Sequence, residues 1–306
     1  MNAPSGTAPN DRARTIEWPT FLLIVGCYGL WLACLFWVAA YSVPIAIVLA
    51  GVLVAFHASL THEVLHGHPF PWKMVNEAMM LLPLNLCIPY HRFRDLHLAH
   101  HRDSNLTDPY DDPESNYLDP KVWSRLSGWK RGLYRVNNTL LGRMIFGPAI
   151  SQATFSMDEW RAARNGDKSV WIAWLVHVPG AAVVLWVVAM SHMPVWAYLI
   201  SAYIGLSLLK IRTFAEHRAH EKARGRTVVI EDSGPLAFLF LNNNLHVVHH
   251  MNPTAAWYDL PGLYRSGKDR YLACNEGYTF QSYRDLFRRH FWRSKDPVPH
   301  PLWPAD

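Results

Sequence analysis

The chain has 306 residues, half of them hydrophobic, and a formal net charge of +5. No basic stripe with base-stacking aromatic residues stands apart from the apolar segments, which argues against a nucleic acid as partner. The four cysteines form no CxxC pair, so we expect no disulfide framework, thiolate zinc site or rubredoxin-type iron site.

Two long stretches of the chain contain no Asp, Glu, Lys or Arg. Residues 18–62 form one, of 45 residues, and residues 169–209 form the other, of 41. At about 1.5 Å per residue, each is roughly twice as long as the ~30 Å hydrocarbon core of a bilayer, so each predicts a hairpin of two spans. The sequence therefore predicts an all-α integral membrane protein with four transmembrane helices in two hairpins, at 19–40, 44–61, 169–190 and 195–212.

The placement of positive charge predicts the topology. Of the 29 Lys and Arg residues, two precede Trp18, thirteen lie in 63–168 and fourteen follow Leu209, so none lies in either short turn. By the positive-inside rule, both termini and all long connections are then cytoplasmic. We expect a bacterial inner-membrane protein with a helical cytoplasmic cap. Its expected parts are a flexible cytoplasmic tail at 1–17 and a single membrane domain at 18–306, whose cap comprises 62–168 and 213–306.

Three segments of the predicted cap are distinctive. Residues 71–90 are apolar but interrupted by charges and prolines, so they predict an interfacial or re-entrant segment and not a span. Residues 108–114 form an acidic loop with prolines, which is either simply solvated or carries carboxylates just outside a metal site. Residues 122–160 mix Trp, Arg and apolar residues, as an amphipathic helix on a membrane surface does.

Clustered histidines are the main candidates for function. The motif HxxHH occurs at 97–101 and at 246–250, and HxxxH occurs at 62–66. Positions i, i+3 and i+4 share one face of a helix, and neutral imidazole is a common ligand of transition metals. Eight imidazoles are too many for one four- or six-coordinate ion. The sequence therefore predicts two metal ions on the cytoplasmic side, with the ligands His62, His66, His97, His100, His101, His246, His249 and His250.

A metal-bound imidazole needs an acceptor on its second nitrogen. Candidate acceptors near the motifs are Glu63, Asp95, Asp108, Asp111, Glu216, Asn242 and Asn243. A lone histidine is usually a packing or surface residue, which leaves unassigned His57, His91, His177, His192, His290 and His300. His68 and His220 each lie near a motif but outside its spacing. Because structural zinc sites favour cysteine, the imidazole-rich pair suits redox-active iron with dioxygen as oxidant.

The three motifs together resemble those of the membrane fatty acid desaturase superfamily, which includes acyl desaturases, carotenoid ketolases and alkane hydroxylases. The resemblance covers His62 to about Leu260. It extends to the residues that flank the last motif. Asn242–Leu245 precede the motif, and Pro253 and 257–261 (WYDLP) follow it, which is similar to the family's HxxHHxxP…YxLP pattern.

The resemblance implies a non-haem di-iron centre with nine histidine ligands and with O2 as co-substrate. His217 takes the place of the ninth ligand, between the fourth span and the last motif, and His220, one turn away, is the alternative. The resemblance also implies two electrons from a separate ferredoxin-, rubredoxin- or cytochrome b5-like donor with its reductase. No haem, flavin or cysteine-cluster motif occurs in the sequence, so we expect this donor not to be fused.

The implied reaction is the O2-dependent introduction of a double bond into a lipid-like, fatty acyl substrate, with membrane lipid as a partner. Residues 111–113 (DDP) are similar to carotenoid ketolases and hydroxylases as much as to acyl desaturases. A di-iron hydroxylase or ketolase that acts on a hydrocarbon, a carotenoid or a small metabolite is therefore the alternative. A metal transporter is a remote alternative, because transporters place ionisable ligands near the bilayer middle, and these spans carry no charged residue.

Overall fold

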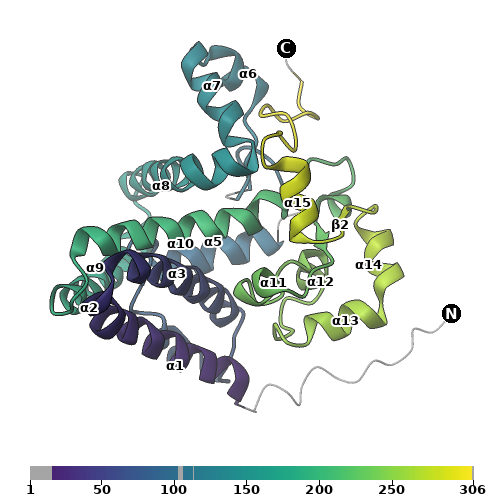
Figure 1. Cartoon of the computed structure of the whole chain (residues 1–306). Coiled ribbons are helices and arrows are strands. Elements are labelled where there is room, and N and C mark those ends of the chain that lie inside the picture. The colour runs from purple at the N-terminus through teal and green to yellow at the C-terminus, as the bar shows by residue number, and fades with distance from the viewer. Residues whose placement is uncertain (1–15, 103–105, 113, 305–306) are drawn as a thin grey trace.

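The structure is a computed structural model that describes residues 16–102, 106–112 and 114–304. Residues 1–15 of the predicted tail at 1–17 lie outside the described residues. Helices dominate, as the sequence predicts (Figure 1). The elements are α1 (Trp18–Ala33), η2 (Cys34–Val38), α2 (Ala39–Tyr41), α3 (Val43–Leu65), α4 (Lys73–Met79), α5 (Tyr90–Arg102), α6 (Pro120–Arg125), α7 (Gly128–Asn137), α8 (Leu140–Arg164), α9 (Lys168–Ala189), α10 (Val195–Ala215), η3 (Ala223–Arg226), β1 (Val229–Ile230), α11 (Pro235–Leu239), α12 (His246–Met251), α13 (Leu260–Ser266), α14 (Lys268–Cys274), β2 (Thr279–Phe280) and α15 (Tyr283–His290).

Four helical segments are long and apolar enough to cross a membrane, and they match the four predicted spans. They are Trp18–Tyr41, Val43–Leu65, Lys168–Ala189 and Val195–Ala215. The turn after the first segment is set by Ser42, whose Oγ accepts the backbone N–H of Ile45 and so caps α3. Both α3 and α10 continue a few residues beyond the predicted ends, so the first histidine motif begins inside α3.

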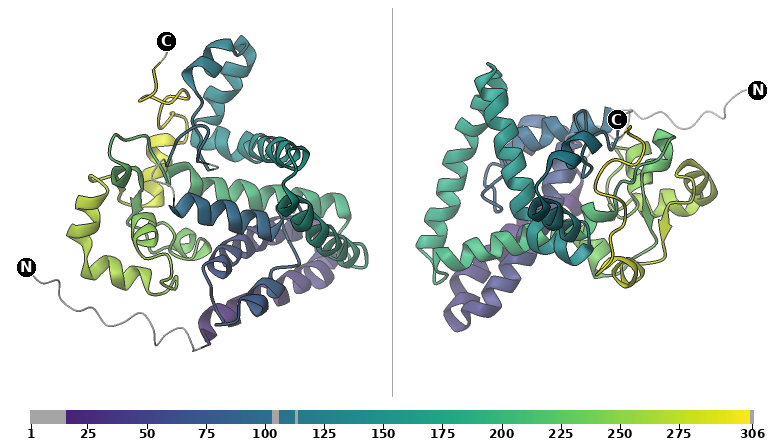
Figure 2. Two further views of the ribbon diagram at one scale, coloured as in Figure 1. Left: turned by 180° about the vertical axis from the view of Figure 1, so that it is seen from behind. Right: turned by 90° about the horizontal axis from the view of Figure 1, so that it is seen from above.

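The long helices pack around α3 and α10. A Cβ at Gly51 would lie 2.6 Å from the side chain of Ile204, and one at Gly205 would lie 2.5 Å from that of Val54. Such small residues let two helix backbones approach closely. The arrangement as two hairpins is not confirmed, because α10 packs mainly along α3, whereas α9 also lies against α5 and α8 (Figure 2, right).

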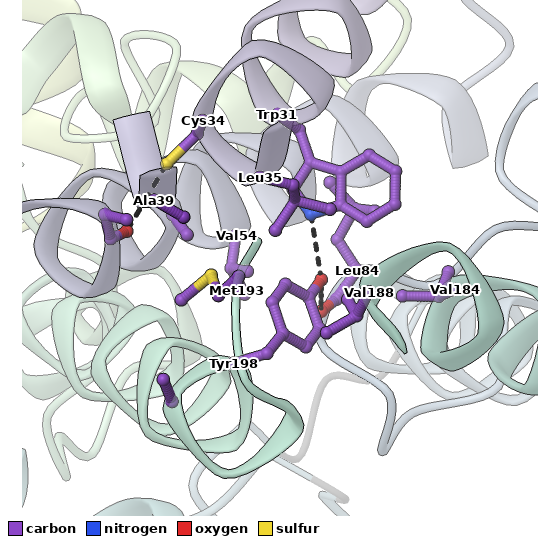
Figure 3. Packing of buried hydrophobic residues seen from close by; sticks show 13 residues of the cluster. Trp31, Cys34, Leu35, Ala39, Val54, Leu84, Val184, Val188, Met193 and Tyr198 are labelled. Carbon is purple, nitrogen blue, oxygen red and sulfur yellow. Dashed lines mark hydrogen bonds between the residues drawn. The ribbon is translucent and has the colours of Figure 1, made fainter. Parts of the chain in front are cut away.

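The irregular segment 80–88, which follows α4, packs between α9 and the other long helices. Leu84 is fully buried there, in the cluster that also contains Tyr198 (Figure 3). Side chains satisfy the backbone of this segment, since Tyr198 Oη donates to the Leu84 carbonyl (2.9 Å) and His177 Nε2 to the Leu86 carbonyl (3.0 Å). Buried irregular backbone requires such partners. The segment lies between α9 and the other long helices, so α9 does not pack along α10 as α3 does. Whether the segment is interfacial or re-entrant stays a prediction.

A second core attaches the C-terminal helices to the end of α10. The strands β1 and β2 pair in parallel, with Val229 opposite Thr279 and Ile230 opposite Phe280. The buried side chains of Ile230 and Phe280 pack with Phe214, near the end of α10. This cluster fixes the chain that leaves α10 against the elements that carry the last histidine motif.

Candidate metal centre

Four parts of the chain deliver histidines to one place. Helix α3 ends there, with His62 in its last turn and His66 at its C-cap. Helix α5 carries the 97–101 motif and α12 carries the 246–250 motif, so both HxxHH motifs are helical, as their spacing predicts. His217 follows the C-cap of α10 directly.

The nine imidazoles that the sequence singled out as ligands come together in two groups. The five-imidazole group consists of His62, His66, His97, His101 and His249. The four-imidazole group consists of His100, His217, His246 and His250. Within each group, one ring nitrogen from every histidine lies within 4.8 Å of the others. Metal binding by these residues remains a prediction that this geometry supports.

Each HxxHH motif contributes to both groups. In both motifs the i and i+4 histidines share a group, whereas the i+3 histidine lies in the other. Thus His97 and His101 belong to the five-imidazole group and His100 to the four-imidazole group, and the 246–250 motif shows the reverse assignment. At 3.6 residues per turn, positions i and i+4 are about 40° apart around the axis, and i+3 lies about 60° to the other side. One helix face can therefore serve two neighbouring ions.

The ring nitrogens within a group face one another at short distances. In the five-imidazole group, His101 Nε2 lies 2.9 Å from His97 Nε2 and 3.1 Å from His249 Nε2. In the four-imidazole group, the Nε2 atoms of His100 and His217 are 3.0 Å apart. A neutral imidazole has one donor and one acceptor nitrogen. Such convergence of nitrogens from different helices is suited to a cation between them.

Two carboxylates orient the imidazoles of α5. His97 Nδ1 donates to Glu114 Oε1 and His100 Nδ1 donates to Asp112 Oδ1, both at 2.8 Å. Since Nδ1 is the donor in both rings, the lone pair of each lies on Nε2, which faces the neighbouring imidazoles. A hydrogen bond from the second ring nitrogen is the usual means by which the tautomer and orientation of a metal-ligating histidine are fixed.

A buried network supports the imidazole of His246 on the other side of the centre. Its Nδ1 donates to Asn243 Oδ1 (3.1 Å), and Asn243 Nδ2 donates to Glu216 Oε1 (3.3 Å). Glu216 in turn pairs with Arg212, with 2.9 Å between Nε and Oε1. Glu216 and Asn243 were among the acceptors expected from the sequence, and the structure places both beside a candidate ligand.

The donor set fits a metal ion on chemical grounds. The Nε2 atoms of His62 and His66 are buried and have no hydrogen-bond partner among the described residues. An unsatisfied buried polar group costs about 1–3 kcal/mol, and a coordinated ion would satisfy both of these nitrogens. No cysteine belongs to either group as described. A set made only of imidazoles suits redox-active iron better than structural zinc.

Burial keeps most of these rings neutral. It lowers the pKa of His246 and His250 well below the usual range, and neighbouring imidazoles lower it further. Neutral imidazole is the form that binds a metal. Burial acts on His100 in the same direction, but the carboxylates of Glu114 and Asp112 outweigh it and raise its pKa to about 9. A cation at His100 Nε2 would take the place of this second proton.

Three of the expected acceptors make other contacts. Asp95 is 43% exposed at its side chain and pairs with the neighbouring Arg94 (2.8 Å). Asp108 accepts the backbone N–H groups of Tyr110 (2.8 Å) and Asp111 (3.0 Å), and Asp111 is exposed. These contacts are typical of a surface ion pair and of a capped turn.

Sequence analysis missed Asp112 and Glu114 as individual residues, although both lie in the acidic loop 108–114. In this loop Asp112 is buried, and its Oδ2 also accepts the backbone N–H of Thr107 (2.7 Å). Of the two interpretations of the loop, the structure favours carboxylates beside the centre. Membership of this acidic run was the only signal in the sequence, because the run does not reveal which side chains turn inward.

Two further expected acceptors, Glu63 and Asn242, contact Trp257. Glu63 Oε2 accepts the backbone N–H of Trp257 (3.1 Å), and Glu63 Oε1 lies 4.0 Å from His62 Nδ1. Asn242 Nδ2 donates to the Trp257 carbonyl (3.0 Å). Both residues therefore fix the chain that follows the last motif, and Glu63 also borders a candidate ligand.

Two histidines near the motifs that were not counted among the nine ligands have other partners. His57 is buried one turn below the first motif, with Nε2 2.8 Å from Tyr28 Oη. His220 Nδ1 lies 3.2 Å from the Lys222 carbonyl, in the loop after α10. Between the two alternatives for the ninth position, the structure thus brings His217, and not His220, into the four-imidazole group.

Four helices that are long and apolar enough to span a membrane, together with two groups of converging imidazoles, define a helical membrane protein with a histidine-rich candidate metal centre. The sequence matches the family described as fatty acid desaturase over residues 40–282, and the chain therefore belongs to the fatty acid desaturase family. This range contains all nine histidines of the two imidazole groups. The family implies an oxidoreductase and typically uses iron. A search of the curated proteins found no match to the chain.

Proposed function

We propose that this protein is an O2-dependent di-iron desaturase that introduces a double bond into a lipid-like, fatty acyl substrate. The observation that carries the proposal is the pair of imidazole groups, of five and four histidines, in a chain of the fatty acid desaturase family. An all-imidazole donor set, with unsatisfied buried nitrogens, is what supports iron as the metal.

Each imidazole group would hold one iron. When bound, the pair supplies the dioxygen-dependent oxidation of an unactivated C–H bond, which no side chain can perform. The contribution of the chain is orientation. Asp112 and Glu114 hold two rings of α5 in one tautomer, and Asn243 does the same for His246. These contacts fix the tautomer and the orientation of the three rings.

The chain also limits the access of water to the centre. His62, His97 and His249 are each 2% exposed, and His100 is fully buried. Four others of the nine are partly exposed, namely His66, His101, His217 and His250. Restricted access of solvent limits side reactions of a strong oxidant. Selectivity then depends on which carbon of the substrate lies nearest to the centre, so a small change in substrate position separates desaturation from hydroxylation.

The proposal includes an orientation and an electron source. Both termini and the metal centre would face the cytoplasm across a bacterial inner membrane, which the distribution of Lys and Arg outside the short turns supports. A separate ferredoxin-, rubredoxin- or cytochrome b5-like donor, with its reductase, would deliver two electrons per turnover. Labelling of a cysteine introduced near residue 192, from the outside of intact cells, tests the orientation, and labelling only after lysis would contradict it.

The decisive experiment combines iron analysis with profiling of cell lipids. Iron bound to the purified protein is measured for the parent chain, for His249→Ala and for His220→Ala as the matched control. Lipids from expressing cells are then compared by mass spectrometry, in which a product about 2 mass units lighter indicates desaturation and one about 16 heavier indicates hydroxylation. We expect about two irons in the parent and the control, and the lighter product. A parent protein without iron, or an iron-replete His249→Ala variant, would refute the proposal.

A further inference from the structure

Helices α6 and α7 project from the rest of the molecule (Figure 1; Figure 2, left). We call residues 120–137, which they span, the basic arm. No side chain of α6 is buried, and in α7 only Asn137 is buried. Helices of 6 and 10 residues are shorter than the ~12–15 residues that an isolated helix needs in water, so packing of an apolar face normally stabilises such elements. The arm lacks that packing within the described chain.

Helix α7 nevertheless has a well-defined apolar face. Trp129, Leu133 and Val136 stand at i, i+4 and i+7, which places them on one side of the helix. Trp129 is 69% exposed and Val136 is 49% exposed, so much of this face is left uncovered by the described part of the chain. The apolar surface continues into the start of α8, where Ile145 and Phe146 are also exposed.

The remainder of the arm carries only positive charge. It contains five cations and no Asp or Glu, namely Lys121, Arg125, Lys130, Arg131 and Arg135. Two of them lie over aromatic rings of the arm and not beside a carboxylate, with Lys130 Nζ 5.6 Å from the Trp129 ring centroid and the Arg135 guanidinium 5.6 Å from that of Trp123. Aromatic residues on one face and Lys and Arg on the others are the composition of a helix that lies in a membrane interface.

We propose that α7 of the basic arm binds the anionic headgroup layer of the membrane that the four long helices cross. Trp129 and Val136 would enter the boundary between headgroups and acyl chains, while the cations of α7 would contact lipid phosphates. Charge complementarity favours anionic lipid, because each Lys or Arg close to such a surface strengthens binding by about fivefold. The lipid supplies the apolar partner that α7 lacks, and it anchors the start of α8 beside the spans.

The test measures hydrogen exchange of the backbone amides of residues 128–137 in the full-length protein. The protein is reconstituted in nanodiscs of zwitterionic phosphatidylcholine alone and in nanodiscs that contain phosphatidylglycerol as well. We expect exchange to be slower by about tenfold or more with the anionic lipid, since three cations of α7 contribute together. Equal exchange in both lipids would overturn the proposal.

Two charge-reversal variants show whether the effect belongs to the arm. The first combines Lys130→Glu, Arg131→Glu and Arg135→Glu, and it should lose the protection by anionic lipid. The second makes the same change in net charge at three exposed arginines of α14 and α15, through Arg270→Glu, Arg284→Glu and Arg288→Glu. It should retain the protection. Equal loss in both variants, or protection that requires an added acidic soluble protein and not anionic lipid, would refute the assignment.

Discussion

The carboxylate of Asp112 offers the sharpest test of how the metal centre is built. Its Oδ1 accepts from His100 Nδ1 (2.8 Å), and its Oδ2 accepts the backbone N–H of Thr107 (2.7 Å). Oδ1 also accepts the backbone N–H of Glu114 (2.9 Å). Asp112→Asn keeps the shape but leaves only one carbonyl oxygen as an acceptor for donors on both sides. The amide nitrogen must then face either the imidazole or the backbone N–H of Thr107, and Asp112 is too deeply buried, at 4% exposure, for water to replace the lost acceptor.

The expected size of the effect follows from these contacts. A lost hydrogen bond to a charged group costs about 1.5–3 kcal/mol, and loss of an outer partner of a metal-binding histidine typically weakens metal affinity by about 10–100-fold. We expect Asp112→Asn to weaken Fe(II) binding within that range. The assay is anaerobic competition with a chelator of known affinity, read as iron bound per purified chain.

Asp108→Asn is the matched control, because Asp108 lies in the same acidic loop but caps only a turn. The substitution keeps Oδ1, which accepts the N–H groups of Tyr110 and Asp111. Iron affinity should therefore change by less than about twofold, within the small effects typical of surface changes. Thermal unfolding of the iron-free variants separates loss of metal from loss of fold. Normal iron affinity in Asp112→Asn, or an equal loss in Asp108→Asn, would show that the loop does not orient His100.

Three further predictions concern the ninth ligand and the packing of the helices. His217→Ala should remove iron from the four-imidazole group, whereas His220→Ala should retain it; elemental analysis of both proteins decides between them. Gly205→Ala should lower the thermal stability by about 1–3 kcal/mol, because the new methyl group meets α3 at 2.5 Å; an unchanged unfolding temperature in detergent would contradict this packing. Glu159→Gln should destabilise the fold by about 3–5 kcal/mol, because it leaves the guanidinium of Arg92, on α5, buried without its charged partner. Asp158→Asn, in an exposed pair on the same helix, should cost less than about 1 kcal/mol in the same unfolding assay.

Much of the helix plan could be predicted because membrane spans and helical faces are local properties. The uncharged stretches 18–62 and 169–209 contain the four long helices almost entirely. The packing of these helices is not local. α10 packs along α3 because Gly51 and Gly205 allow close approach, and segment 80–88 fills the space beside α9. Sequence order suggested the second hairpin. The sequence also predicted an interfacial or re-entrant segment at 71–90, but it did not reveal that part of this segment would pack against α9.

The sequence by itself determined which imidazoles share a helix face, because the spacing of HxxHH fixes angles around one axis. Only the tertiary structure decided how nine histidines divide into groups of five and four, since that division depends on how α3, α5, α12 and the end of α10 meet. The same holds for Asp112 and Asp108. Both belong to one acidic run, but only the folded loop turns Asp112 toward His100, because burial and side-chain direction arise from contacts between segments far apart in the chain.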